Sequence, residues 1–195
     1  MLKVDTFLTL LYYLKAIMDE TDLDLRVIDS KDLPAEALEV IVDMCSRAFG
    51  QNYQPFMDTF VDATHVIGYL NGEIVSHALW VERWLQIEDT PFLQTAYVEA
   101  VVTEESHRGK GFASAVMKRL AEEIQDYELG ALCTGFPEFY LHLGWQIWEG
   151  PLFIRTQEGM TSSHGETVMI LQLPNSPELD INASLSAEWR EGELW

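Results

Sequence analysis

Apolar and polar positions along residues 23–173 predict alternating strands and helices. Apolar residues recur about once per helical turn after Pro34 and again over Gly111–Gln125, which predicts two amphipathic helices. Shorter helices are expected at Pro55–Val61 and Glu138–Leu143. Alternating or continuously apolar runs predict strands at Leu23–Ile28, His65–Leu70, Glu73–Trp84, Phe92–Thr103, Leu129–Cys133, Trp145–Ile154 and Thr167–Leu173. Asn71-Gly72, between the second and third of these strands, is typical of a tight hairpin turn.

This order of elements predicts an α/β (α+β) fold, with a mixed central sheet of six to seven strands and helices on both faces. Residues 23–195 are expected to form a single domain, whose last part, from Pro174 onward, is a polar tail. Residues 1–22 are expected to form a helical N-terminal extension. The apolar run Phe7–Met18 within it is too short to span a bilayer, and Lys15 interrupts it.

Charge and cysteine usage narrow the classes of partner. The 195 residues carry 32 acids against 12 Lys and Arg, a net charge of -20. Such a surface argues against nucleic acid and anionic membranes and favours polycationic partners, although solubility alone also explains it. Cys45 and Cys133 stand alone, without histidines at metal-ligand spacing. We therefore expect two buried, reduced thiols, a cytoplasmic location and no metal site.

One short segment reverses the sign of the charge. Between Ser106 and Ala121 there are four cations and no acid, and Arg108-Gly109-Lys110-Gly111-Phe112-Ala113 fits the pattern R-x-x-G-x-A. Its small residues let a backbone approach a pyrophosphate, and the following helix presents free N–H groups to an anion. The segment contains neither a Rossmann fingerprint nor a Walker loop. It indicates a phosphate site, with a simple tight turn as the alternative.

Placed between a strand and an amphipathic helix, this turn resembles the acetyl-CoA pyrophosphate loop of GNAT-superfamily N-acetyltransferases. Three further segments are similar to aminoglycoside 2'-N-acetyltransferases, and the resemblance covers roughly Leu25 to Trp195. They are Tyr97-Val98-Glu99-Ala100-Val101, Phe139-Tyr140 followed by Gly144-Trp145, and Ala187-Glu188-Trp189-Arg190-Glu191-Gly192-Glu193-Leu194-Trp195. The resemblance implies a GNAT fold and an acetyl-CoA-dependent enzyme in which an amine of an aminoglycoside or similar polycationic aminosugar attacks directly. A polyamine, peptide or other small amine as acceptor, or a non-catalytic acyl-CoA-binding sensor, stays open.

The resemblance also implies roles for individual residues. Val101, Val102 and Thr103 would pair with the pantetheine arm, and Arg108 to Ala113 would hold the pyrophosphate. The Val101 N–H would donate to the developing oxyanion, and Tyr140 would be the general acid. Glu99, an acid in an otherwise apolar strand, would take the proton from the acceptor ammonium. The alternatives are a solvated strand carboxylate for Glu99 and a core tyrosine with a surface hydroxyl for Tyr140.

The acidic C-terminal tail indicates the kind of acceptor. From Thr156 onward Arg190 is the sole cation against seven acids. Glu193 and the Trp195 carboxylate, together with Glu99, are expected to form an anionic pocket for a polycationic acceptor. Asn52, or its neighbour Gln51, stands where the family carries a substrate-binding aspartate. A frayed tail is the alternative, although a terminal tryptophan is costly to expose. The apolar extension and the strand edges are compatible with a homodimer; the amine and its regiochemistry stay open.

Overall fold

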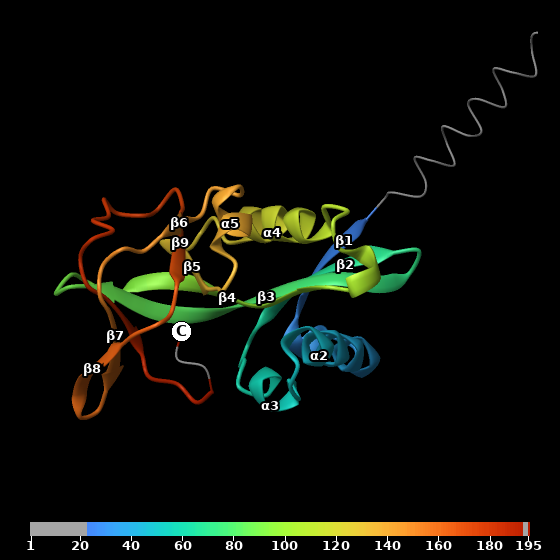
Figure 1. Cartoon of the computed structure of the whole chain (residues 1–195), viewed down its shortest axis with the longest axis horizontal. Helices are drawn as coiled ribbons and strands as arrows, with labels where there is room; N and C mark the ends of the chain where they lie inside the picture. Colours follow the sequence, from blue (N-terminus) through green and yellow to red (C-terminus); the bar gives the residue numbers. More distant parts are fainter. Residues whose placement is uncertain (1–22, 193–194) are drawn as a thin grey trace, which may run out of the picture.

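The computed structural model describes residues 23–192 and 195, in which ten strands form one curved mixed sheet (Figure 1). Along the main path the strand order is β6-β9-β5-β4-β3-β10-β7-β8, and β1 and β2 extend the sheet beside β3. The strands are β1 Asp24–Asp29, β2 Thr64–Leu70, β3 Glu73–Ile87, β4 Leu93–Thr103, β5 Leu129–Cys133, β6 Gln146–Ile147, β7 Leu152–Thr156, β8 Gly159–Ser163, β9 Val168–Gln172 and β10 Leu185–Glu188.

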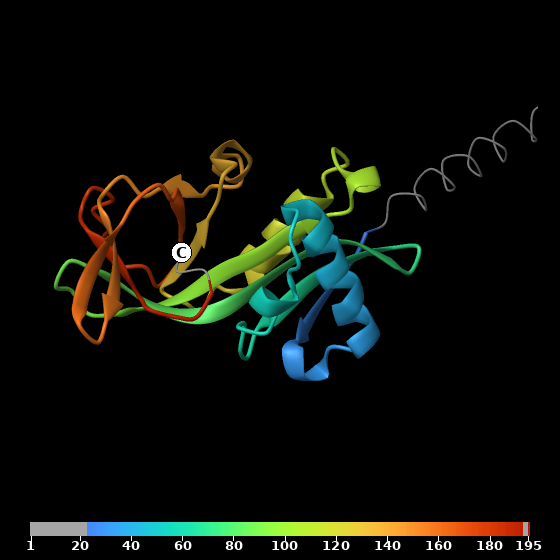
Figure 2. The ribbon, with the colours of Figure 1, turned by 60° about the horizontal axis from the view of Figure 1, so that its bottom comes forward.

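The two long strands β3 and β4 run through the whole molecule (Figure 2). β3 pairs with β2 over its first half and with β10 at its far end, so it connects the two parts of the sheet. The predicted hairpin is confirmed, because β2 and β3 are antiparallel and joined at Asn71 and Gly72. Both turn residues have positive φ, 53° and 87°, as a type I′ turn requires.

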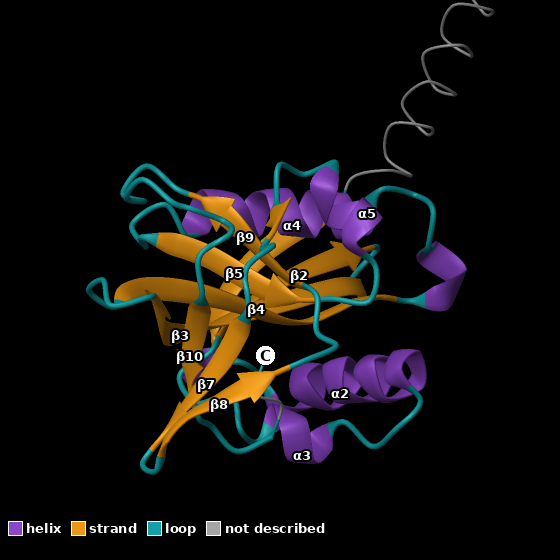
Figure 3. Ribbon diagram, turned by 60° about the vertical axis from the view of Figure 1, so that its left-hand side comes forward, coloured by secondary structure: helices purple, strands orange, loops and turns teal. Residues whose placement is uncertain are grey.

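Helices cover both faces of the sheet, as the sequence predicts (Figure 3). α2 (Ala35–Phe49) and α3 (Gln54–Met57) lie on one face, and α4 (Phe112–Glu123) and α5 (Pro137–Leu141) on the other. Each pair of helices encloses its own apolar core. Ile41, Met44 and Cys45 of α2 anchor the first, and Val116, Met117 and Leu120 of α4 anchor the second. Two 3₁₀ turns, η1 (Ser30–Asp32) and η2 (Glu105–His107), complete the described elements.

The strand count is where the fold departs from expectation, with ten strands in the described residues against six to seven predicted. The predicted strand Trp145–Ile154 is divided between β6 and β7, which lie in different parts of the sheet. The chain turns between them at Gly150, where a Cβ would lie 1.8 Å from the Ala183 carbonyl oxygen, so the two backbones are in direct contact. The tail that the sequence presents as polar contributes β10, which lies between β3 and β7.

The predicted N-terminal extension, residues 1–22, lies outside the described residues. Within the described part of the chain, every helix is too short or too polar to cross a bilayer.

Candidate active site

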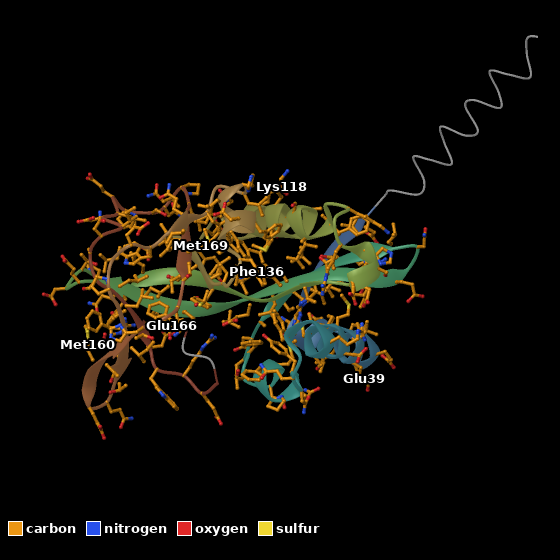
Figure 4. The ribbon with its side chains drawn as sticks, in the orientation of Figure 1. Glu39, Lys118, Phe136, Met160, Glu166 and Met169 are labelled. Atoms are coloured by element: carbon orange, nitrogen blue, oxygen red, sulfur yellow. The ribbon has the colours of Figure 1, made fainter. Side chains whose placement is uncertain are left out.

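β4 and β5 separate in the middle of the sheet, and a pocket forms where they part. The two parallel strands pair only over Thr95–Tyr97 and Leu129–Ala131, although β4 continues to Thr103 and β5 to Cys133. The pocket beyond this point has a volume of about 560 Å³. Its walls include Glu99, Val101 and Arg108 from the predicted site and Tyr140 of α5. Phe136, labelled in Figure 4, also lines it and is 80% exposed.

β4 contains a bulge inside this pocket. Leu79 of β3 pairs with Glu99, but His77 pairs with Val102, so Ala100 and Val101 together lie opposite Ala78. Ala100 has φ of 51°, a left-handed conformation that is strained for a residue with a Cβ. The bulge removes the Ala100–Val101 segment from the regular ladder with β3. Val101, Val102 and Thr103 all line the pocket, as the predicted pantetheine contact requires.

Glu99 precedes the bulge and is buried, with 9% of the residue exposed. Its Oε1 accepts a hydrogen bond from Arg190 Nη2, and the two side chains form an ion pair. The Arg190 guanidinium also lies 5.3 Å from the ring centre of Tyr97 and 5.8 Å from that of Phe60. Glu99 is therefore a buried, paired carboxylate rather than a solvated one.

Arg190 reaches Glu99 because β10 is fixed to β3 just before it. Arg83 of β3 is 1% exposed, and its guanidinium donates to the Glu188 backbone oxygen at 2.8 Å and to Oε1 of Glu188 at 3.2 Å. Burial lowers the pKa of Arg83, and repulsion from Arg190 acts in the same direction, while Glu188 opposes both. Arg190 is a site residue without a role predicted from the sequence. Its position as the only cation of an acidic tail was the available signal.

Tyr140 projects from α5 into the same pocket and is 7% exposed. Its ring packs edge-on against Trp145, with the centroids 6.2 Å apart. Burial raises the pKa of Tyr140 to about 12, and a hydrogen bond with Thr134 acts in the opposite direction. The phenol is thus protonated at neutral pH and can donate a proton into the pocket. Tyr140 is thus a buried residue that lines the pocket, which disfavours the alternative of a core tyrosine with its hydroxyl at the protein surface.

The predicted phosphate turn lies beside the pocket and leads directly into α4. Gly109 and Gly111 have φ of 76° and 84°, and no atom lies within 4 Å of a Cβ built at either position. Gly111 is the N-cap of α4 and provides no side-chain cap, so the first backbone N–H groups of the helix are available to an anion. Arg108 lines the pocket and donates from Nε to the Thr103 carbonyl at 3.2 Å. Lys118 points away from the sheet on the outer side of α4 (Figure 4).

The remaining predicted acceptor residues are more dispersed. Gln51 lines the pocket, whereas Asn52 is outside its lining and accepts a hydrogen bond from the Gln54 N–H at the start of α3. Glu193 lies outside the described residues. Trp195 is 4% exposed and belongs to the core that α2 covers. Cys133, expected to be buried, is half-buried and lines the pocket.

Comparison with known proteins gives consistent results. Residues 29–148 match the family described as "Acetyltransferase (GNAT) domain". The chain is 32% identical over 183 residues to a protein of Mycolicibacterium fortuitum named aminoglycoside 2'-N-acetyltransferase, covering 87% of this chain and 91% of that protein.

Solved structures share the fold. The Escherichia coli GNAT-family N-acetyltransferase YhbS, in complex with CoA, matches with a TM-score of 0.60 and 15% identity over 87% of this chain and 92% of that one. Escherichia coli ElaA matches with a TM-score of 0.55 and 16% identity, covering 76% of this chain and 99% of that one.

Proposed function

Because this chain belongs to the GNAT family of N-acetyltransferases, we propose that it transfers the acetyl group of acetyl-CoA to an amine of an aminoglycoside or a similar polycationic aminosugar. One observation carries the proposal: Glu99, Val101 and Tyr140, the three residues expected to perform the chemistry, line a single pocket together with Arg108 of the phosphate turn. The name of the Mycolicibacterium fortuitum relative supports the choice of acceptor. So does the net charge of -20, which favours a polycation.

The residues present fit acetyl-CoA, which supplies an acetyl group activated as a thioester. Gly109 and Gly111 leave room for a pyrophosphate to approach the backbone, and the N-terminus of α4 provides N–H donors and the positive end of the helix dipole. Arg108 and Lys110 add positive charge beside it. Val101 to Thr103 lie on the part of β4 that β5 no longer pairs with, so this edge can accept an extended arm.

The proposed chemistry uses three residues that line the pocket. Glu99 accepts a proton from the acceptor ammonium, directly or through a water, so that the neutral amine can attack the thioester carbon. The Val101 N–H donates to the carbonyl oxygen as it gains negative charge. A C–N bond forms and the C–S bond breaks. Tyr140 then donates its proton to the departing sulfur, since its raised pKa keeps the phenol protonated until that step. The attacking nitrogen loses its second proton to solvent, and solvent reprotonates Tyr140.

The ion pair between Glu99 and Arg190 supports a cationic acceptor. A guanidinium already occupies the position next to the Glu99 carboxylate, held over the ring of Tyr97. An ammonium of the acceptor has the same charge and can take that place, which would bring the reacting amine to its proton acceptor. A neutral acceptor would leave the Glu99 carboxylate without a positively charged partner once Arg190 is displaced.

A thiol-release assay with acetyl-CoA tests the proposal. We expect turnover of aminoglycosides that carry a 2′-amine and little with matched compounds that carry a 2′-hydroxyl. Spermidine and a lysine peptide should be slower than the best aminoglycoside. Glu99→Gln should lower kcat/KM by about 100-fold or more, while the exposed control Glu73→Gln should leave it unchanged. Faster turnover of spermidine or the peptide would refute the aminosugar as acceptor.

A further inference from the structure

The strained bulge of β4 requires contacts that stabilise it. Ala100, with φ of 51°, adopts a conformation that costs about 1–3 kcal/mol for a residue that is not glycine. Such a conformation persists only where surrounding contacts stabilise it. The Ala100 carbonyl oxygen has one such contact, because it accepts a hydrogen bond of 2.9 Å from Nδ1 of His77.

His77 is the inner end of a chain of polar groups that crosses the core beneath β2 and β3. Its Nε2 lies 2.9 Å from Nδ1 of His65, and Nε2 of His65 lies 2.9 Å from the Ser30 hydroxyl. The two histidines are 0% and 1% exposed. Burial lowers the pKa of His65 to about 4 and, together with repulsion from His65, that of His77 to about 3, so both rings are neutral at physiological pH.

Neutral rings give the chain a single direction. A carbonyl oxygen only accepts, so Nδ1 of His77 must carry the hydrogen and Nε2 of His77 must be an acceptor. Nδ1 of His65 then carries a hydrogen, Nε2 of His65 accepts, and the Ser30 hydroxyl donates. Each group fixes the tautomer of the next, and the last donor in the series is directed at the bulge.

We propose that His77, with His65 behind it, is a positioning residue that aims the Val101 N–H into the pocket. In a trans peptide the C=O of Ala100 and the N–H of Val101 belong to the same plane and point in opposite directions. Holding the Ala100 carbonyl toward His77 therefore turns the Val101 N–H away from His77. This inference rests on the oxyanion role that the proposed function gives to Val101.

Two substitutions at His77 separate positioning from simple core packing. His77→Leu removes the donor, whereas His77→Asn can place an amide N–H near the position of Nδ1. Loss of an oxyanion donor lowers kcat by about 10²–10³-fold, and a misdirected donor retains part of this effect. We expect His77→Leu to lower kcat by about 30-fold or more with both KM values within about 3-fold of the parent, and His77→Asn to recover most of the loss. His65→Leu should have a smaller effect in the same direction.

Ile67→Ala is the matched control, since Ile67 is buried and pairs with His77 across β2 and β3. It should lower the unfolding temperature without a comparable fall in kcat. A His77→Leu variant that loses as much stability as Ile67→Ala but keeps kcat within about 3-fold of the parent would overturn the proposal. If His77→Leu does not fold, His65→Leu provides the comparison: a loss of stability like that of Ile67→Ala with the kcat of the parent would overturn the proposal.

A second readout needs no acceptor amine. The Val101 amide resonance of the parent should shift when acetyl-CoA is added, and in the folded variant that lacks the His77 donor this shift should be reduced. An equal shift in both proteins would contradict the positioning role. An inactive parent enzyme would instead refute the proposed function, and the amide signal would still decide whether His77 sets the orientation of the bulge.

Discussion

Replacement of Arg190 by methionine should loosen the tail and expose Glu99 to the acceptor at the same time. The substitution keeps an apolar stem but removes the guanidinium that pairs with Glu99 and lies 5.3 Å from the centre of the Tyr97 ring. Breaking a fully buried pair by removing one partner costs about 3–5 kcal/mol. The two side chains here are 16% and 9% exposed, which lowers our estimate to about 2 kcal/mol. For a chain of this size that corresponds to a fall in Tm of about 4–8 °C.

The same substitution should strengthen binding of the acceptor. Under the proposed function an incoming ammonium displaces Arg190 from Glu99 in the parent protein, whereas Arg190→Met lacks this competing cation. We expect the KM for the amine to fall by about 3- to 10-fold, equivalent to about 0.7–1.4 kcal/mol, with the KM for acetyl-CoA unchanged. Thermal unfolding with saturating acceptor should show a larger stabilisation of the variant than of the parent, because the added cation replaces the lost one.

Two control substitutions test whether these effects are specific to the guanidinium of Arg190. Arg26→Met removes an exposed arginine of β1 and should change neither Tm nor KM appreciably. Arg190→Lys keeps the charge but not the planar guanidinium, so it should show an intermediate loss of stability. A KM for the amine that rises 10-fold or more in Arg190→Met, with unchanged Tm, would refute the reasoning, because Arg190 would then assist the acceptor rather than compete with it.

Four further substitutions or conditions test other parts of the structure. Tyr140→Phe should lower kcat by about 100-fold while retaining the fold and the acetyl-CoA affinity, as measured by thiol release and thermal unfolding. Gly111→Glu should raise the KM for acetyl-CoA well above that of the control Gly111→Ala. Both variants place a side chain at a backbone φ of 84°, but only Glu adds a negative charge. Gly150→Ala should cost about 3 kcal/mol or more in urea unfolding, because its Cβ would lie 1.8 Å from the Ala183 oxygen, whereas Gly135→Ala has no such neighbour. Lowering the pH from about 6.5 toward 4 should reduce the unfolding free energy by up to about 1.4 kcal/mol per pH unit for each of His65 and His77. The pKa values of both histidines in the folded protein lie below the unfolded value of 6.5, so the unfolding free energy is highest above pH 6.5 and falls as the unfolded chain takes up protons at lower pH. The unfolding free energy of His77→Asn should depend less steeply on pH.

The β2–β3 hairpin and the helix after the phosphate turn could be predicted from residues that are neighbours in the sequence. The hairpin at Asn71-Gly72 needs residues that tolerate positive φ, and the sequence presents them together. The spacing of Val116 and Leu120 identifies the buried face of α4, and Gly111 just before it marks the helix start. In each case the determining residues are neighbours in the chain, so a short window contains the whole physical reason.

Other features depend on partners that are far away in the chain. β10 has only four residues, and its place in the sheet comes from β3 and β7 rather than from its own alternation. Arg190 and Glu99 are 91 positions apart, so no local pattern could join them. The bulge has no signature in the strand itself, because regular strands also contain alanine and the group that bonds to the Ala100 carbonyl, His77, is 23 positions away. The division of Trp145–Ile154 likewise follows from contact between Gly150 and Ala183.

The single extra residue in β4 would let Glu99 and Val101 perform the two different roles that the proposed function gives them. In a regular strand, residues two apart project to the same face, and their backbone groups belong to the ladder with the neighbouring strand. The bulge opposes two residues of β4 to Ala78, so Ala100 and Val101 have no register partners of their own in β3. Glu99 keeps its regular pairing with Leu79, which holds the carboxylate in place beside Arg190. Val101 lies within the bulge two residues later, and under the proposed function its N–H donates to the thioester oxygen instead of to the ladder with β3.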